Sequence, residues 1–178
     1  RTLFWGFDEK NLPLNGRVWM PKGEGYFPIV LISHGNHKME YFSDGGYAYF
    51  GELIASRGFI TVSLDLNFLN YSNWSRIPKK DMELRTWMIF QHLLQIETFS
   101  STEGNPFYNK VDFNKIALIG HSRGGLASTM AVQYKDWFSE DPSLKEAEKF
   151  NIQSVIALAP TDKRVDGKIP MLYDTNYL

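Results

Sequence analysis

The sequence has no cysteine, no long apolar segment and no marked excess of charge of either sign. Without cysteine there is no disulfide framework, no cysteine metal site and no cysteine nucleophile. No apolar run approaches the roughly 18 residues that a membrane-spanning helix needs. A formal net charge of −1 gives no reason to expect nucleic acid or an acidic membrane as a partner. What remains is a globular chain of 178 residues, long enough for one domain with a real core.

Four short apolar runs organise the chain. They cover residues 28–33, 59–64, 115–120 and 154–159. Polar and apolar residues do not alternate within them, which is typical of strands that helices cover on both faces. A buried helical segment has the same pattern, but the shortness of the runs and their β-branched content favour strands.

Helical segments are predicted between these runs. The helix expected over residues 47–57 places one apolar stripe on the core, made of Tyr49, Phe50, Leu53 and Ile54. Asp81 is expected to cap a second helix, whose buried face consists of Met82, Ile89, Leu93 and Ile96. Strand and helix in alternation indicate an α/β fold with a mostly parallel sheet, to which residues 16–21 add an edge strand. We expect a single domain over residues 1–178.

One sequence motif predicts a catalytic residue. Gly120-His121-Ser122-Arg123-Gly124 matches G-x-S-x-G, in which a strand turns sharply into a helix and presents a serine. An apolar run leads into it and small residues follow it, as the motif demands. Gly120 and Gly124 then let strand and helix approach each other. The pattern predicts Ser122 as an acyl-transfer nucleophile, the alternative being a glycine-bearing turn without catalytic role.

A second segment supports the first. Ser33-His34-Gly35-Asn36 follows the first apolar run. In enzymes with such a serine turn, this loop and the residue after the nucleophile each supply a backbone N–H to the oxyanion hole. Those donors are here expected to be Asn36 and Arg123. An ordinary turn at the end of a strand is the alternative for His34-Gly35.

With both motifs in hand, the chain resembles the α/β-hydrolase superfamily. The segment 120–125 looks like the nucleophile elbow of chlorophyllases and of bacterial cutinase-like and dienelactone-hydrolase-like esterases, and 27–35 is similar to their oxyanion strand. Segments 34–37 and 67–70 resemble those of bacterial chlorophyllase-like hydrolases. The resemblance implies an α/β-hydrolase fold with helices on both faces, a small-molecule or lipid-like ester substrate, and neither cofactor nor metal. The compartment stays open, with a lean towards an exported bacterial protein.

The sequence departs from the family in one respect. The resemblance implies a triad in the chain order serine, acid, histidine. The four histidines, His34, His37, His92 and His121, all precede Ser122. Residues 176–178 look like the start of the strand after which the acid normally lies. We therefore expect the C-terminal part of the fold, with acid and base, to be missing, and this piece alone to be inactive.

Three carboxylates are weaker candidates for the triad acid. Asp162 follows the fourth apolar run, where some hydrolases place the acid, but a loop-capping role is favoured. Asp174 is assigned to a loop, because glycine and proline crowd that region. Asp65 ends the second strand and is interpreted as structural.

Other residues are assigned around the expected site. His121 is expected to pack beside Ser122, and His34 and His37 to line the pocket, since two histidines alone are too few for a metal site. The Arg123 side chain is expected to contact either the substrate or a surface carboxylate, and the carboxylate is favoured. Residues 68–80 form an aromatic loop that either shapes substrate access or packs on the surface.

These observations predict a carboxylic ester hydrolase that forms an acyl-enzyme on Ser122. An amide or lactone hydrolase of the same fold is one alternative. A non-catalytic binding domain of the α/β-hydrolase type is the other, and the absence of a histidine after Ser122 favours it.

Overall fold

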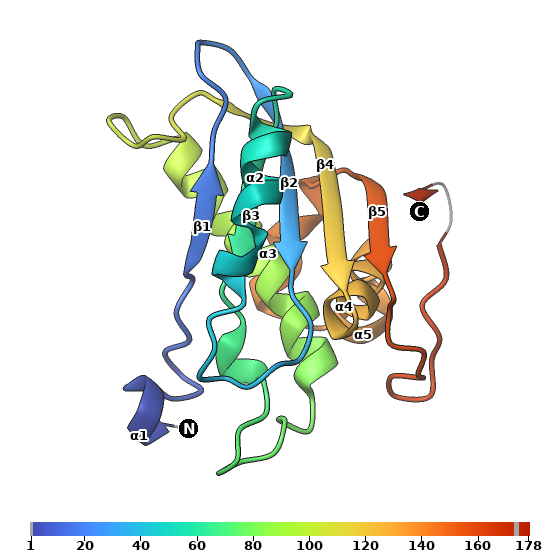
Figure 1. Ribbon diagram of the computed structural model, residues 1–178. Coiled ribbons are helices and arrows are strands. Elements are labelled where there is room, and N and C mark those ends of the chain that lie inside the picture. The colour runs from blue at the N-terminus through green and yellow to red at the C-terminus, as the bar shows by residue number, and fades with distance from the viewer. Residues whose placement is uncertain (1, 173–174) are drawn as a thin grey trace.

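A six-stranded sheet forms the centre of the computed structural model, which describes residues 2–172 and 175–178. The strands lie in the order β1-β3-β2-β4-β5-β6. Their bounds are Gly16–Trp19 (β1), Phe27–Ser33 (β2), Ile60–Leu64 (β3), Val111–His121 (β4), Ile152–Leu158 (β5) and Asn176–Tyr177 (β6). Only β1 pairs antiparallel, with β3, and the other pairings are parallel (Figure 1). The predicted α/β fold with a mostly parallel sheet is confirmed.

Helices lie on both faces of the sheet (Figure 1). The α-helices are Thr2–Trp5 (α1), Ala48–Ala55 (α2), Asp81–Ser100 (α3), Arg123–Val132 (α4) and Lys135–Phe138 (α5). Three 3-10 helices cover Asp44–Tyr47 (η1), Asn67–Leu69 (η2) and Pro142–Lys149 (η3). No helix among the described residues combines the length and apolar character needed to cross a membrane.

Successive side chains of a strand point to opposite sides, and in β2 and β3 both sides are buried. In β2, Ile29 and Leu31 join the main core beneath α3, whereas Val30 and Ile32 join a smaller cluster beneath α2. This two-sided burial explains the unbroken apolar runs of residues 28–33 and 59–64. The predicted buried face of α3 is confirmed, since the following residues are all buried: Met82, Ile89, Leu93 and Ile96.

Strand β4 is longer than its apolar run. It begins at Val111, four residues before the run that predicted it. Its first part is half-exposed or exposed at residues 112–115, so hydrophobicity does not mark it. Pairing with Phe27 and Pro28 of β2 makes it a strand instead, with a register irregularity after Pro28.

Helix α2 contacts the sheet along a different line from the predicted stripe. Phe50 and Ile54 pack on the sheet as expected, but Tyr49 and Leu53 are exposed. The buried residues of α2 are instead Gly51 and Ala55. A small residue lets the helix approach the strands closely, and a search for large apolar residues does not find it.

Asp81 is not the cap of α3. It is the first residue of the helix, and the preceding Lys80 makes no side-chain capping bond. The carboxylate of Asp81 instead accepts hydrogen bonds from Arg123, on α4. A tertiary ion pair has taken the place of the predicted local contact.

The packing of α2 predicts different costs for two neighbouring residues. Ile54→Ala should lower the free energy of unfolding by about 1–3 kcal/mol, because it removes methyl groups from the cluster on the sheet. Leu53→Ala should change it by less than about 1 kcal/mol, because that side chain is half-exposed. Urea denaturation of both variants measures the difference. Equal losses would contradict this orientation of α2.

Candidate active site

Ser122 lies in the turn that joins β4 to α4, with φ 53° and ψ −117°. A positive φ is unusual for a residue with a side chain and costs energy that the surroundings must offset. Four backbone hydrogen bonds hold this turn. The N–H of Ser122 donates to Leu158, and its carbonyl accepts from Gly125, Leu126 and Thr161. The turn is therefore fixed by α4 on one side and by the end of β5 on the other.

Two glycines of the motif are needed for close approach. A methyl group on Gly120 would lie 2.2 Å from the carbonyl oxygen of Gly124. A methyl group on Gly124 would lie 1.9 Å from the carbonyl oxygen of Ser33, at the end of β2. Backbone atoms cannot yield to such contacts. The first turn of α4 thus lies against both β4 and β2.

The loop after β2 lies beside this turn, because Ser33 and Gly120 pair across parallel neighbours. A methyl group on Gly35 would lie 3.0 Å from the Cβ atom of Ser122. Among residues 2–172 and 175–178, no group accepts a hydrogen bond from the backbone N–H of Asn36 or Arg123. Arg123 begins α4, so its N–H is one of the helix N–H groups that have no acceptor within the helix.

His34 is a structural residue and does not line a pocket. It is fully buried, its Nδ1 donates to the carbonyl oxygen of Gly35 at 2.7 Å, and its Nε2 accepts the N–H of Leu66 at 3.1 Å. Burial, helped by the charge of Arg85, lowers the pKa of His34 to about 3. The neutral ring therefore braces the loop that contains Asn36.

His37 and His121 stack beside the turn. Their rings are nearly parallel, with centroids 6.3 Å apart. His37 is exposed and His121 half-buried. A methyl group on Gly35 would lie 2.9 Å from Nδ1 of His121, so this ring packs on the loop after β2. In the described part of the chain, no three acidic or histidine side chains come together as a metal site would require.

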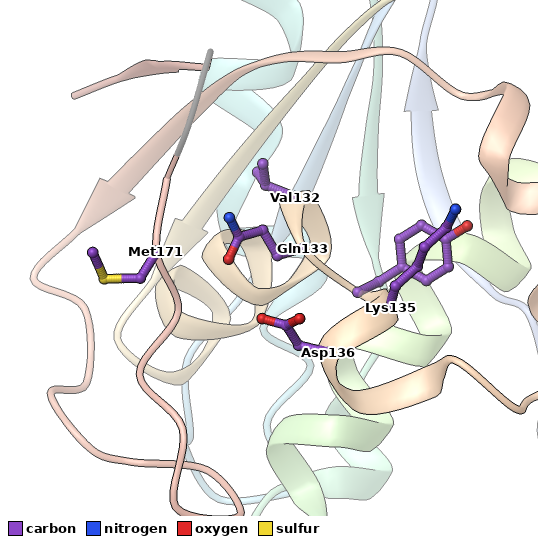
Figure 2. Close-up of a pocket in the computed structure, with 6 residues that line it drawn as sticks. Val132, Gln133, Lys135, Asp136 and Met171 are labelled. Atoms are coloured by element: carbon purple, nitrogen blue, oxygen red, sulfur yellow. The ribbon is translucent and has the colours of Figure 1, made fainter.

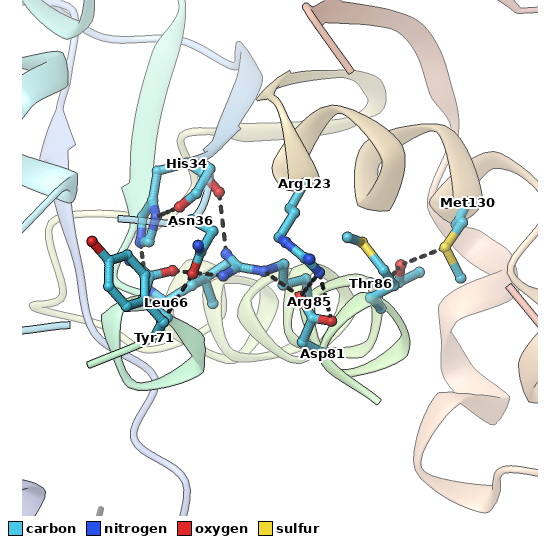
Figure 3. A network of polar contacts seen from close by, with 12 residues as sticks. His34, Asn36, Leu66, Tyr71, Asp81, Arg85, Thr86, Arg123 and Met130 are labelled. Carbon is cyan, nitrogen blue, oxygen red and sulfur yellow. Dashed lines mark hydrogen bonds and ion pairs between the residues drawn. The ribbon is translucent and has the colours of Figure 1, made fainter. Parts of the chain in front are cut away.

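A buried ion cluster connects the loop after β2 with the start of α4 (Figure 3). Nη1 of Arg123 lies 2.9 and 2.8 Å from the two carboxylate oxygens of Asp81, and Nε of Arg85 lies 3.6 Å from one of them. Arg85 also donates to the carbonyl oxygen of His34 and to Oδ1 of Asn70. Burial lowers the pKa of Arg85 to about 10, which leaves it charged at neutral pH. The partner of Arg123 is thus a buried carboxylate, and the prediction of a surface carboxylate as its partner is wrong.

Arg85 was missed in the sequence analysis, although the sequence contains a signal for it. The residue lies three positions after Met82 and four before Ile89, on the apolar face of α3. It also follows Asp81 by four positions, the spacing at which helix side chains meet. An arginine in the middle of an apolar helix face, with an acid one turn away, indicates a buried ion pair.

The carboxylates considered as the triad acid have different surroundings in the structure. Asp65 accepts hydrogen bonds from the N–H and the side-chain amide of Asn67, which supports its structural interpretation. Asp162 is exposed. Asp174 lies outside the described residues.

The segment 68–80 is only partly a surface loop. Phe68 is buried, whereas Trp74 is 88% exposed. The N–H of Tyr71 donates to Oδ1 of Asn36 at 2.9 Å, so this segment supports the loop after β2.

A separate pocket lies at the other end of α4 (Figure 2). It is lined by Val132, Gln133, Tyr134, Lys135, Asp136 and Met171. The ten residues of α4 place it roughly 15 Å from Ser122 along the helix axis. It therefore does not belong to the site around Ser122.

Comparison with known proteins adds a family and three relatives. A family model described as Chlorophyllase matches residues 8–168. The chain is 24% identical over 161 residues to the proteins named Esterase FrsA of two Shigella boydii strains, serotypes 18 and 4, and of Escherichia fergusonii. The match covers 90% of this chain and 33% of each relative. The chain thus spans about a third of the length of these curated relatives.

The buried state of His34 predicts how stability depends on pH. Its folded-state pKa lies below the unfolded value of 6.5, so protons bind preferentially to the unfolded chain below that pH. Its contribution to stability should be complete above pH 6.5 and decrease between pH 6.5 and 3, by up to about 1.4 kcal/mol per pH unit. Urea unfolding of wild type and His34→Gln between pH 7.5 and 4.5 measures this. For His34→Gln, the free energy of unfolding should change less steeply with pH, by the equivalent of about one proton. His37→Gln, at an exposed histidine, is the control. Equal slopes for wild type and both variants would refute the prediction.

Proposed function

This chain belongs to the chlorophyllase family, and from that premise we propose that it is a serine hydrolase of carboxylic esters with Ser122 as its nucleophile. One observation carries the proposal. Ser122 is held at φ 53° between a strand and a helix, beside two backbone N–H groups that have no acceptor among the described residues. A nucleophile elbow with an oxyanion hole needs this combination of strained serine and free donors.

The proposed reaction has two steps. The Ser122 oxygen attacks the acyl carbonyl while a base takes the hydroxyl proton, and the carbonyl π electrons move to the oxygen. The N–H groups of Asn36 and Arg123 donate hydrogen bonds to that anion. Collapse of the tetrahedral intermediate expels the alcohol, which takes up the proton, and leaves an acyl-enzyme. Water then hydrolyses it and restores the serine.

Two histidines are excluded as the base. Both ring nitrogens of His34 are engaged in the hydrogen bonds that brace its loop. The ring nitrogens of His92 lie 2.7 and 3.1 Å from the carbonyl oxygens of Met88 and Asn15. Burial lowers the pKa of His92, as it does for His34. That the base follows Ser122 in the chain, as in the serine–acid–histidine order, stays a prediction.

The surroundings of the site favour an apolar substrate group. The loops after β2 and β3 extend beyond the edge of the sheet at which β4 ends (Figure 1). These loops contain exposed aromatic side chains: Tyr41, Phe42, Tyr71 and Trp74. Exposed apolar side chains that form a patch are typical of binding surfaces, and these four lie on loops at the edge of the sheet where β4 ends. We therefore propose a small-molecule or lipid-like ester with an apolar acyl or alcohol group.

Replacement of the serine tests the proposal. Ser122→Ala in the whole protein should reduce turnover of p-nitrophenyl acyl esters by at least about 10³-fold, because no covalent intermediate forms. The fold should be unchanged by circular dichroism, and Ser139→Ala, at an exposed serine, should retain wild-type turnover. A fluorophosphonate probe should label wild type at Ser122, located by peptide mass spectrometry.

The same assays separate the alternatives. Labelling of Ser122 without ester turnover, but with turnover of an amide or lactone, would assign another acyl hydrolase. No labelling of the wild-type protein would contradict the enzyme proposal and favour a binding domain.

A further inference from the structure

Three charged side chains, those of Asp81, Arg85 and Arg123, lie together (Figure 3). Asp81 and Arg85 are one helical turn apart on α3, and their side chains are 3% and 0% exposed. The side chain of Arg123 reaches them from the first residue of α4 and is 25% exposed. Two cations share one carboxylate, so the cluster carries a net charge of +1.

Arg85 holds the loop that provides the first donor. Its Nη1 donates to the carbonyl oxygen of His34 at 3.1 Å, and its Nη2 donates to Oδ1 of Asn70 at 2.6 Å. Asn70 precedes Tyr71, whose N–H donates to Oδ1 of Asn36 at 2.9 Å. One guanidinium therefore restrains the loop after β2 both directly, at His34, and through Tyr71, at Asn36.

Asp81 holds the residue that provides the second donor. Its two carboxylate oxygens lie 2.9 and 2.8 Å from Nη1 of Arg123. The backbone N–H of the same arginine is the other oxyanion donor of the proposed function. Asp81 thus joins the two donor segments, because its other partner is Arg85.

We propose that Asp81, Arg85 and the side chain of Arg123 are positioning residues, which set the spacing between the N–H groups of Asn36 and Arg123 and place positive charge beside the oxyanion. The inference rests on the proposed function, since it assigns a role in stabilising the same anion. Donors act on an oxyanion only from about 2.7–3.1 Å, so small displacements weaken them. Buried partners that are already hydrogen-bonded need no reorganisation during the reaction.

Arg123→Met tests this role without removing a donor. The backbone N–H remains, whereas the link to Asp81 is lost. Asp81 is buried but keeps Arg85 as a charged partner at 3.6 Å, so circular dichroism first verifies that the variant folds. We expect kcat to fall by about 10- to 100-fold, less than for the complete loss of a donor, with KM within about twofold of wild type. Arg57→Met, at an exposed arginine just beyond α2, is the matched control and should behave as wild type.

Boronic acids give a readout that a merely structural role would not move. The Ser122 oxygen adds to boron and forms a tetrahedral anion that resembles the reaction intermediate. In Arg123→Met, the affinity for an alkyl boronic acid should fall by the same factor as kcat, while KM is retained. Arg123→Lys keeps a cation near Asp81 and should recover part of both.

Asp81→Asn and the double variant test the same link from its other end, with folding measured separately. Asp81→Asn leaves Arg85 without its carboxylate, so circular dichroism and the fluorophosphonate-reactive fraction are measured first. In the folded fraction, Asp81→Asn should lower kcat as Arg123→Met does. The double variant should be no slower than the slower single variant, because both changes break one link.

The outcomes separate this inference from the proposed function. Wild-type kcat and boronate affinity in Arg123→Met would overturn the positioning role while leaving Ser122 as nucleophile. A smaller reactive fraction with unchanged kcat per labelled site would also overturn it and show a structural brace alone. If fluorophosphonate fails to label the wild-type protein, the proposed function fails and the positioning role fails with it.

Discussion

The close approach of α4 to the end of β2 is the constraint on which the rest of the site depends. Gly124 lies so near the backbone of Ser33 that a single methyl group would clash. Because β2 and β4 are parallel neighbours, both chain segments leave the sheet at one edge. The serine turn and the loop containing Asn36 are therefore brought together by backbone packing, before any side chain of the site contributes.

Buried charged side chains then hold the serine turn next to the loop containing Asn36, and their burial costs desolvation energy. Arg85 is fully buried, and a buried charge is tolerated only when other groups compensate it. Its Nε forms no hydrogen bond among the described residues but lies 3.6 Å from the Asp81 carboxylate. Here a carboxylate, a backbone carbonyl and an amide oxygen face it, each from a different segment. Such a cluster contributes little net stability compared with apolar packing, but it specifies which segments lie next to one another.

Patterns within single elements were predictable from the sequence. Continuous apolar runs identified β2, β3, β4 and β5. Both faces of β2 and β3 are covered, whereas β5 keeps partly exposed residues. Errors arose where contacts between elements override local pattern. The first part of β4 is a strand because it pairs with β2, and α2 packs through Gly51, which a search for large apolar residues overlooks.

The sequence by itself determined the order of strands and helices and the place of Ser122 between them, since periodicity and motif spacing are local properties of the chain. Tertiary structure alone decided that His34 is a neutral buried brace and that Asp81 pairs with Arg123. Residues 34 and 85 are 51 positions apart, and residues 81 and 123 are 42 apart. Contacts at such separations depend on how helices pack on the sheet, and a charged side chain is buried only after that packing has supplied its partners.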